Sequence, residues 1–270
     1  MNYIAVLVKN QINRFEFKLC FAILFLLSIA GILIGYALNY QQDAVYVRSA
    51  ADNFLMISTY ASVIRRLITF LFPLLAAALC AGYRNKNDEL YMLLRMNRRQ
   101  FVYGNALVTV GLTMAVFAAV LILNQLLCFV AFPLSASDNV WGRIDYDLIR
   151  SYEPEYLYDF WSIQNPYIYN LLFIFNIGFM SGGIGLLTYG LGYVKMLRRL
   201  KPILLAALVF VLFISLFVLS EVIHIPLLSF LSYIEPGHQI GTVHYFGFVG
   251  CIYAVGMLLT VKGKKSYENI

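Results

Sequence analysis

The sequence predicts an all-α, polytopic membrane protein in which six transmembrane helices follow an N-terminal amphipathic helix. Of its 270 residues, 61% are hydrophobic and only 13% are charged, and the mean hydropathy is +0.75, unlike the composition of soluble globular domains. A membrane-spanning helix needs roughly 20 consecutive apolar residues. Six runs of about this length or longer lack Asp, Glu, Lys and Arg: residues 19–38, 67–83, 101–132, 168–194, 202–220 and 243–261.

The distribution of charge along the chain indicates its orientation. With the N-terminus inside, fifteen of the 20 lysines and arginines fall in cytoplasmic segments, and ten of the 14 acidic residues fall in external ones. By the positive-inside rule, the protein is expected to reside in the plasma membrane with both termini in the cytoplasm. Because the net charge of +6 is gathered beside the membrane, it does not indicate a nucleic-acid partner.

Residues 1–18 precede the first run and are expected to form an interfacial elbow helix. Ile4, Val8, Ile12 and Phe15 recur at helical spacing, and basic and amide side chains occupy the other positions. Such a helix lies in the plane of the membrane surface. A disordered basic tail is the alternative, but the apolar stripe is regular over three turns.

The segment 39–64 is expected to be an external loop. Arg65 and Arg66 follow it at the outer end of the second run, and Glu221 follows the fifth run at the same side. The two arginines are expected to reach lipid headgroups. Together with Glu221 they are also the candidates for an outer mouth that binds an anionic group of a substrate.

Two further external segments are expected. Residues 133–166 are acidic and aromatic, which indicates either anchoring at the interface or a surface for a cationic amphipathic ligand. Residues 226–234 are apolar but too short to cross, so a short interfacial helix is expected in the outer leaflet.

Small residues and cysteines add to this picture. The fourth run contains Gly178 and Gly182 among six glycines, and small residues four apart allow two helices to approach closely. A hinge for a moving helix is the alternative. All four cysteines fall inside predicted spans, so neither a disulfide framework nor a metal site is indicated.

The short cytoplasmic stretch 84–100 (RNKNDELYMLLRMNRRQ) lies between the second and third runs. Leu90, Leu93 and Leu94 share one face of a helix there, and a simple connection would not need an apolar face. Asn97 followed by Gln100 could cap the third span as a capping box. A helix of this kind is suited to a groove on a cytoplasmic partner.

This stretch resembles the permease subunits of the ABC-2 type exporter family. In that family the loop reads approximately Glu-Leu-Leu-Leu, a short gap, Pro, an apolar residue, Ser-Arg-Arg, a few apolar residues and Gly-Lys. Residues 89–94 (ELYMLL) and 97–105 (NRRQFVYGN) follow this pattern without a gap, and the six spans and the elbow agree with the family's layout. The chain departs from it at Lys86–Asn87, which replace Gly-Thr, at Arg95 (Pro in the family), at Asn97 (Ser) and at Asn105 (Lys).

The resemblance implies a dimer of permease chains, identical or related, above two ATP-binding subunits, with 84–100 as the coupling helix. Leu90, Leu93 and Leu94 would then sit in a groove of the ATP-binding subunit, with Glu89, Arg95, Arg98 and Arg99 on its rim. The chain has no GxxxxGK[ST] phosphate loop, so no cofactor is expected on it and ATP and Mg²⁺ would belong to the partner.

Two other classes of function remain as alternatives. A secondary, ion-coupled transporter also lacks a phosphate loop, but such carriers usually place an ionisable residue near the midplane, and the six runs contain no Asp, Glu, Lys or Arg. An intramembrane enzyme needs catalytic groups at depth, whereas His224, His238 and His244 all fall at or outside the outer boundary.

Overall fold

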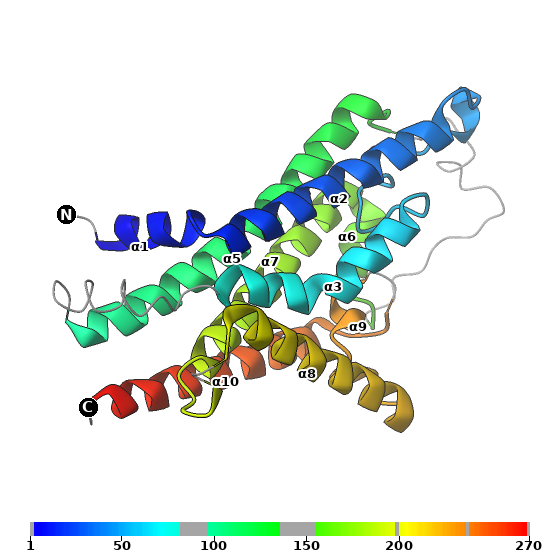
Figure 1. Ribbon diagram of the computed structural model, residues 1–270. Helices are drawn as coiled ribbons and strands as arrows, with labels where there is room; N and C mark the ends of the chain where they lie inside the picture. Colours follow the sequence, from blue (N-terminus) through cyan, green and yellow to red (C-terminus); the bar gives the residue numbers. More distant parts are fainter. Residues whose placement is uncertain (1–2, 82–96, 136–154, 198–199, 236–237, 269–270) are drawn as a thin grey trace.

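The computed structural model describes residues 3–81, 97–135, 155–197, 200–235 and 238–268, and all regular structure within these residues is helical. Six of the described helices are long and apolar enough to cross a membrane (Figure 1). The prediction of an all-α, multi-pass membrane protein is therefore confirmed. The six are α2 (Phe15–Asn39), α3 (Ser62–Ala81), α5 (Arg98–Ala131), α7 (Pro166–Leu191), α8 (Pro202–Ile223) and α10 (Thr242–Glu268).

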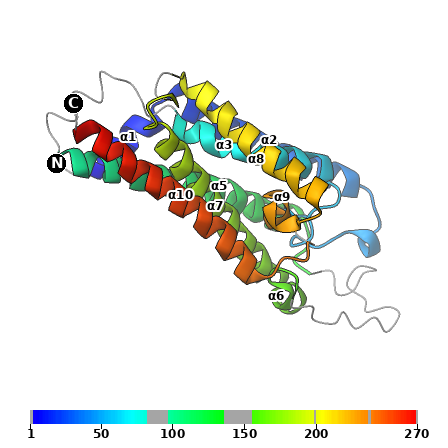
Figure 2. The same cartoon turned by 90° about the horizontal axis from the view of Figure 1, so that it is seen from below.

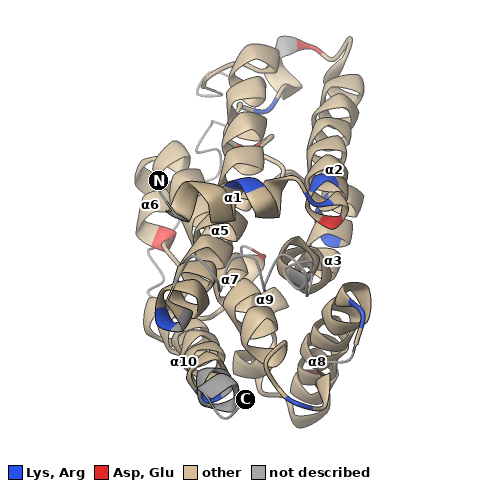
Figure 3. Cartoon of the chain, turned by 60° about the vertical axis from the view of Figure 1, so that its left-hand side comes forward, with Lys and Arg blue, Asp and Glu red and all other residues tan. Residues whose placement is uncertain are grey.

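Five shorter helical elements complete the described chain. The amphipathic α1 precedes the bundle, α6 precedes α7, and three short pieces lie in connections. Figure 3 shows that the long helices carry few charged residues along most of their length. The shorter elements are α1 (Tyr3–Ile12), η1 (Ala44–Tyr46), α6 (Asp159–Gln164), η3 (Pro226–Leu228) and α9 (Leu231–Ile234).

Helix α7 forms the centre of the bundle, where it packs against α5 and α10 (Figure 2). In the most apolar 18-residue stretch of each helix, 78% of the residues are buried in α7, against 28% in α2 and in α8 and 22% in α10. The outer three helices therefore present most of their apolar surface outward, as expected for helices that face lipid.

The glycines of α7 explain how its neighbours come so close. A Cβ atom added at Gly185 would lie 2.8 Å from Cys80 Sγ, and one added at Gly190 would lie 2.7 Å from the carbonyl oxygen of Gly256 in α10. Real Cβ atoms do not approach other heavy atoms so closely, so only glycine fits at these positions. The glycines thus serve helix packing; the structure does not test the alternative of a hinge.

Helix α1 packs on the bundle mainly through Leu7 and Gln11, and of the expected stripe Val8 takes part in this contact. Leu7 is buried against Val108 of α5, and Gln11 Nε2 donates to the carbonyl oxygen of Leu79 in α3 at 3.3 Å. Ile4 and Ile12 are instead exposed, and α1 ends before α2 begins at Phe15. An outward apolar stripe on this helix is where contact with lipid would be made.

Three local expectations differ from the structure. Helix α3 begins at Ser62, five residues before the expected run, because the two arginines at its start were excluded by their charge. Asn97 is the N-cap residue of α5, but its side chain makes no capping hydrogen bond. The 226–234 segment forms η3 and α9 instead of one helix, and Phe230, Tyr233 and Ile234 are buried in the core.

Candidate functional site

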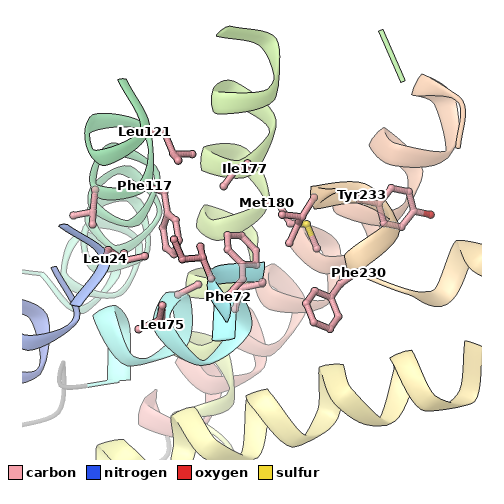
Figure 4. Close-up of a cluster of buried hydrophobic side chains, with 14 of the residues drawn as sticks. Leu24, Phe72, Leu75, Phe117, Leu121, Ile177, Met180, Phe230 and Tyr233 are labelled. Atoms are coloured by element: carbon pink, nitrogen blue, oxygen red, sulfur yellow. The ribbon is translucent and has the colours of Figure 1, made fainter. Parts of the chain in front are cut away.

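The centre of the bundle is filled by apolar side chains around one small cavity. Leu24 of α2, Phe72 of α3, Phe117 of α5 and Ile177 of α7 are among the residues that line it (Figure 4). The Phe72 and Phe117 rings meet edge to face, with centroids 5.0 Å apart. The cavity has a volume of about 10 Å³, room for one water at most, and its lining carries almost no polar surface. At this point between α2, α3, α5 and α7, the apolar side chains leave no room for a larger molecule.

The roof of the cavity comes from a segment that was expected to be an external loop. Residues 49–58, which we call the re-entrant segment, connect α2 to α3 through successive turns, and Leu55 and Met56 of this segment line the cavity. Its backbone reaches the level of Ser28, which lies thirteen residues, roughly 20 Å, from the start of α2. A hydrocarbon core about 30 Å thick would therefore contain it.

Non-helical backbone at such a depth must be satisfied by protein, and three amide side chains do so here. Asn124 of α5 accepts from the backbone N–H of Leu55 at 3.0 Å, through Oδ1. Gln125 Nε2 donates to the carbonyl oxygen of Ala50 at 3.3 Å. Asn170 Nδ2 of α7 donates to the carbonyl oxygen of Ala51 at 3.1 Å and to Gln125 Oε1 at 2.8 Å. We call these three residues the amide latch.

The structure brings Arg65, one of the candidate outer-mouth residues, to a polar cluster beside this segment. Arg65 Nη1 donates to the carbonyl oxygen of Ile57 at 3.1 Å. Thr69 Oγ1 of the same helix donates to Glu235 Oε1 at 2.9 Å, and Glu235 Oε2 lies 3.9 Å from His238 Nε2, the distance of an ion pair rather than of a hydrogen bond. His238 first, then Thr69 and the guanidinium of Arg65, hold the pKa of Glu235 below its usual value, although partial burial opposes them.

The other two outer-mouth candidates do not join this cluster. Arg66 and Glu221 are both exposed, and neither forms an ion pair within the part of the chain that the structure describes. The partner in the polar cluster is Glu235, which sequence reasoning did not select. Its place beside Thr69 arises because α9, which Glu235 directly follows, packs against α3.

Most of the candidate coupling residues lie outside the described residues: Glu89, Leu90, Leu93, Leu94 and Arg95. Arg98 and Arg99 are the first two residues of α5, and Arg99 is exposed. The two described helix ends that flank this stretch, those of α3 and α5, are both contacted by α1.

A row of polar side chains lies on the N-terminal half of α5, within Arg98–Ala131. Asn105, Thr109 and Thr113 follow one another at intervals of four residues and are all 0% exposed. Thr113 Oγ1 donates to the carbonyl oxygen of Thr109 at 2.6 Å and lies 3.0 Å from Cys80 Sγ. Among the described residues, neither amide atom of Asn105 has a hydrogen-bond partner, and the same is true of Thr109 Oγ1 and of Gln11 Oε1. The polar row is therefore incompletely satisfied by protein.

Sequence reasoning missed the re-entrant segment and the latch that holds it. The available signal was the interruption of apolar runs by Asn124, Gln125 and Asn170, since a buried amide needs a partner. Among the described residues, no group of three or more His, Cys, Asp or Glu side chains could hold a metal ion.

In comparisons with known proteins, no family model, no curated protein and no solved structure matches the chain.

Proposed function

We propose that the chain is the membrane-spanning permease subunit of an ATP-driven ABC exporter, which forms the translocation pathway and couples to a separate ATP-binding subunit. The observation that carries the proposal is the pattern of residues 84–100, an apolar helical face followed by paired arginines where the third span begins. A stretch with this pattern between two spans is suited to docking in a groove of a cytoplasmic protein.

The contacts of α1 support a coupling role for that stretch. Gln11 is bonded to Leu79, two residues before α3 ends, while Leu7 packs against Val108 and beside Gly104 in the first turns of α5. The elbow helix thus touches both helices from which the stretch emerges. Movement of a docked partner would be passed to α1, α3 and α5 together. Helix α5 carries the polar row, and α3 and α5 both line the small cavity.

The partners follow from the same proposal. ATP and Mg²⁺ would be held by the ATP-binding subunit, the hydrolysis would take place there, and the permease would supply only the path. A second permease chain, identical or related, would pair with this one through an exposed apolar face such as that of α2 or α8. The protein would reside in the plasma membrane with both termini in the cytoplasm.

The test compares a double substitution with a single one. Leu93→Ala combined with Leu94→Ala removes two apolar anchors, each expected to contribute about 1 to 3 kcal/mol to docking. The ATP-binding subunit should then be lost when the tagged permease is purified from its native membrane. Arg99→Ala is the matched control, because a rim charge contributes little to a docked interface and this side chain is exposed.

Retention of the partner and ATP hydrolysis by the purified complex in lipid nanodiscs are the two measurements. If no ATP-binding subunit accompanies the unsubstituted permease, the exporter assignment is wrong. If the double variant retains both partner and hydrolysis at the level of the unsubstituted chain, residues 84–100 are only a connection.

A further inference from the structure

The re-entrant segment is held in the bundle by contacts of a different kind from those that hold the helices. Ala50, Phe54, Leu55 and Met56 are almost fully buried, yet the segment is not helical and contains no cysteine that could join it to a helix by a disulfide. Its backbone is bonded within the segment, to the carbonyl oxygen of Pro133 through the N–H of Ala50 at 2.8 Å, and to α5 and α7 through the side chains of the amide latch. Side-chain hydrogen bonds of this sort contribute little net stability, because water can replace each partner once the segment is exposed.

The seated position also leaves two buried amide oxygens without a hydrogen bond. Asn53 Oδ1, within the segment, and Asn170 Oδ1, in the latch, are both shielded from solvent and have no hydrogen-bond partner in the described part of the chain. An unpaired buried acceptor carries a desolvation penalty, which disappears when water reaches it. Withdrawal of the segment would therefore relieve both penalties while the latch exchanges its protein partners for water.

The position of the segment gives its withdrawal a clear effect. Leu55 and Met56 cover one side of the cavity, whose other walls are Phe72, Phe117 and their neighbours from the long helices, together with Ile234 of α9. If the roof lifts, the cavity opens toward the outer end of the bundle without any of the long helices separating. The segment is bonded to Arg65 at Ile57, close to the start of α3, which would serve as the pivot.

We propose that residues 49–58 are a movable outer gate, which closes the path when seated on Asn124, Gln125 and Asn170 and opens it when it withdraws toward the outside. The proposal does not depend on how transport is driven, so it applies to an ion-coupled carrier as well as to an ATP-driven exporter. Its failure and the failure of the exporter assignment can thus be told apart.

A native cysteine lies directly beneath the gate and can report its position. Cys128 of α5 is 0% exposed, its thiol donates to the carbonyl oxygen of Asn53 at 3.4 Å, and Ala50 packs beside it. In a chain whose other three cysteines are replaced by alanine, a membrane-impermeant maleimide added outside intact cells can reach Cys128 only when the gate has withdrawn. The measured quantity is the rate at which Cys128 is labelled.

Asn170→Leu removes two of the latch bonds and should raise this rate about tenfold, and Gln125→Leu should raise it by a smaller factor. Asn176→Leu is the matched control, because Asn176 is a buried amide of the same helix that bonds Tyr158 and not the gate. A second reporter, a chain that keeps only Cys80, should stay unlabelled in all variants, since Cys80 is buried in the cytoplasmic half.

Three results would overturn the proposal. The first is an unchanged Cys128 rate in both Asn170→Leu and Gln125→Leu, which would make the segment a fixed part of the core. The second is an equal rise in Asn176→Leu, and the third is labelling of Cys80, because either would show general loosening of the bundle. Should Asn170→Leu fail to reach the membrane, Gln125→Leu still decides between these outcomes.

Discussion

Replacement of Gly256 by alanine tests whether α7 and α10 depend on contact between their backbones. A Cβ atom at Gly256 would lie 2.9 Å from the backbone nitrogen of Leu187 and 3.0 Å from Leu186 Cγ. Backbone cannot turn aside as a flexible side chain can, so the helices must move apart. Overpacking of this kind costs about 1 to 3 kcal/mol.

Gly250→Ala in the same helix is the matched control, since nothing lies within 4 Å of a Cβ atom added there. Both variants gain the same helix propensity, about 1 kcal/mol for alanine over glycine, so this gain cancels in the comparison. The midpoint of thermal unfolding should therefore be lower in Gly256→Ala than in Gly250→Ala by roughly 2 to 12 °C.

A thiol-reactive fluorophore in detergent provides the assay, in a chain whose exposed Cys251 is replaced by alanine, because Cys20, Cys80 and Cys128 are buried until the bundle unfolds. Equal midpoints for the two variants would show that α10 is not seated on α7 as described, and the account of α7 as the central helix would have to be withdrawn.

The remaining predictions concern buried or partly buried polar groups. Asn105→Leu should raise the midpoint of thermal unfolding, because the two unpaired amide atoms of Asn105 destabilise the unsubstituted chain by about 1 to 3 kcal/mol. A lower midpoint in the variant would show that Asn105 has a hydrogen-bond partner in the membrane. Because the folded pKa of Glu235 is lowered, its stabilising contribution is complete above the usual carboxyl value of 4.5 and is lost as the pH falls through the lowered pKa. The midpoint should thus fall more steeply below about pH 4.5 in the unsubstituted chain than in Glu235→Gln, and parallel curves would contradict this contact.

The sequence predicts the helices well and the connections poorly, and the reason is physical. A run such as 202–220 is apolar on every side, so local composition alone indicates a span, and α8 covers it. The start of α3 was missed because Arg65 and Arg66 interrupt the apolar pattern, although both are accommodated in its first turns. For residues 49–58, the local pattern is a short apolar stretch of the kind that many loops contain. The segment is held inside the bundle by amide side chains of α5 and α7, which are distant from it in the sequence. The local sequence of residues 49–58 therefore does not predict its position.

The outer-mouth candidates illustrate the same limit. Charge marked Arg65, Arg66 and Glu221 equally, but within the described residues only Arg65 of the two arginines is near enough to a carboxylate, that of Glu235, to help lower its pKa. The difference arises from how the chain after α8 folds back, which depends on the burial of Phe230 and Tyr233 rather than on any charge.

The central place of α7 has a consequence for how the protein is made. Helix α7 leaves the ribosome before α8 and α10, yet its glycine-lined face is complementary to α10, which is synthesised last of the three. Until α10 inserts, the close-packing side of α7 faces lipid, which cannot match the contact made between the glycine positions of the two helices. Membrane quality control would meet this exposed surface in every nascent chain. The interval between synthesis of α7 and insertion of α10 is therefore the stage at which the protein is most vulnerable to degradation.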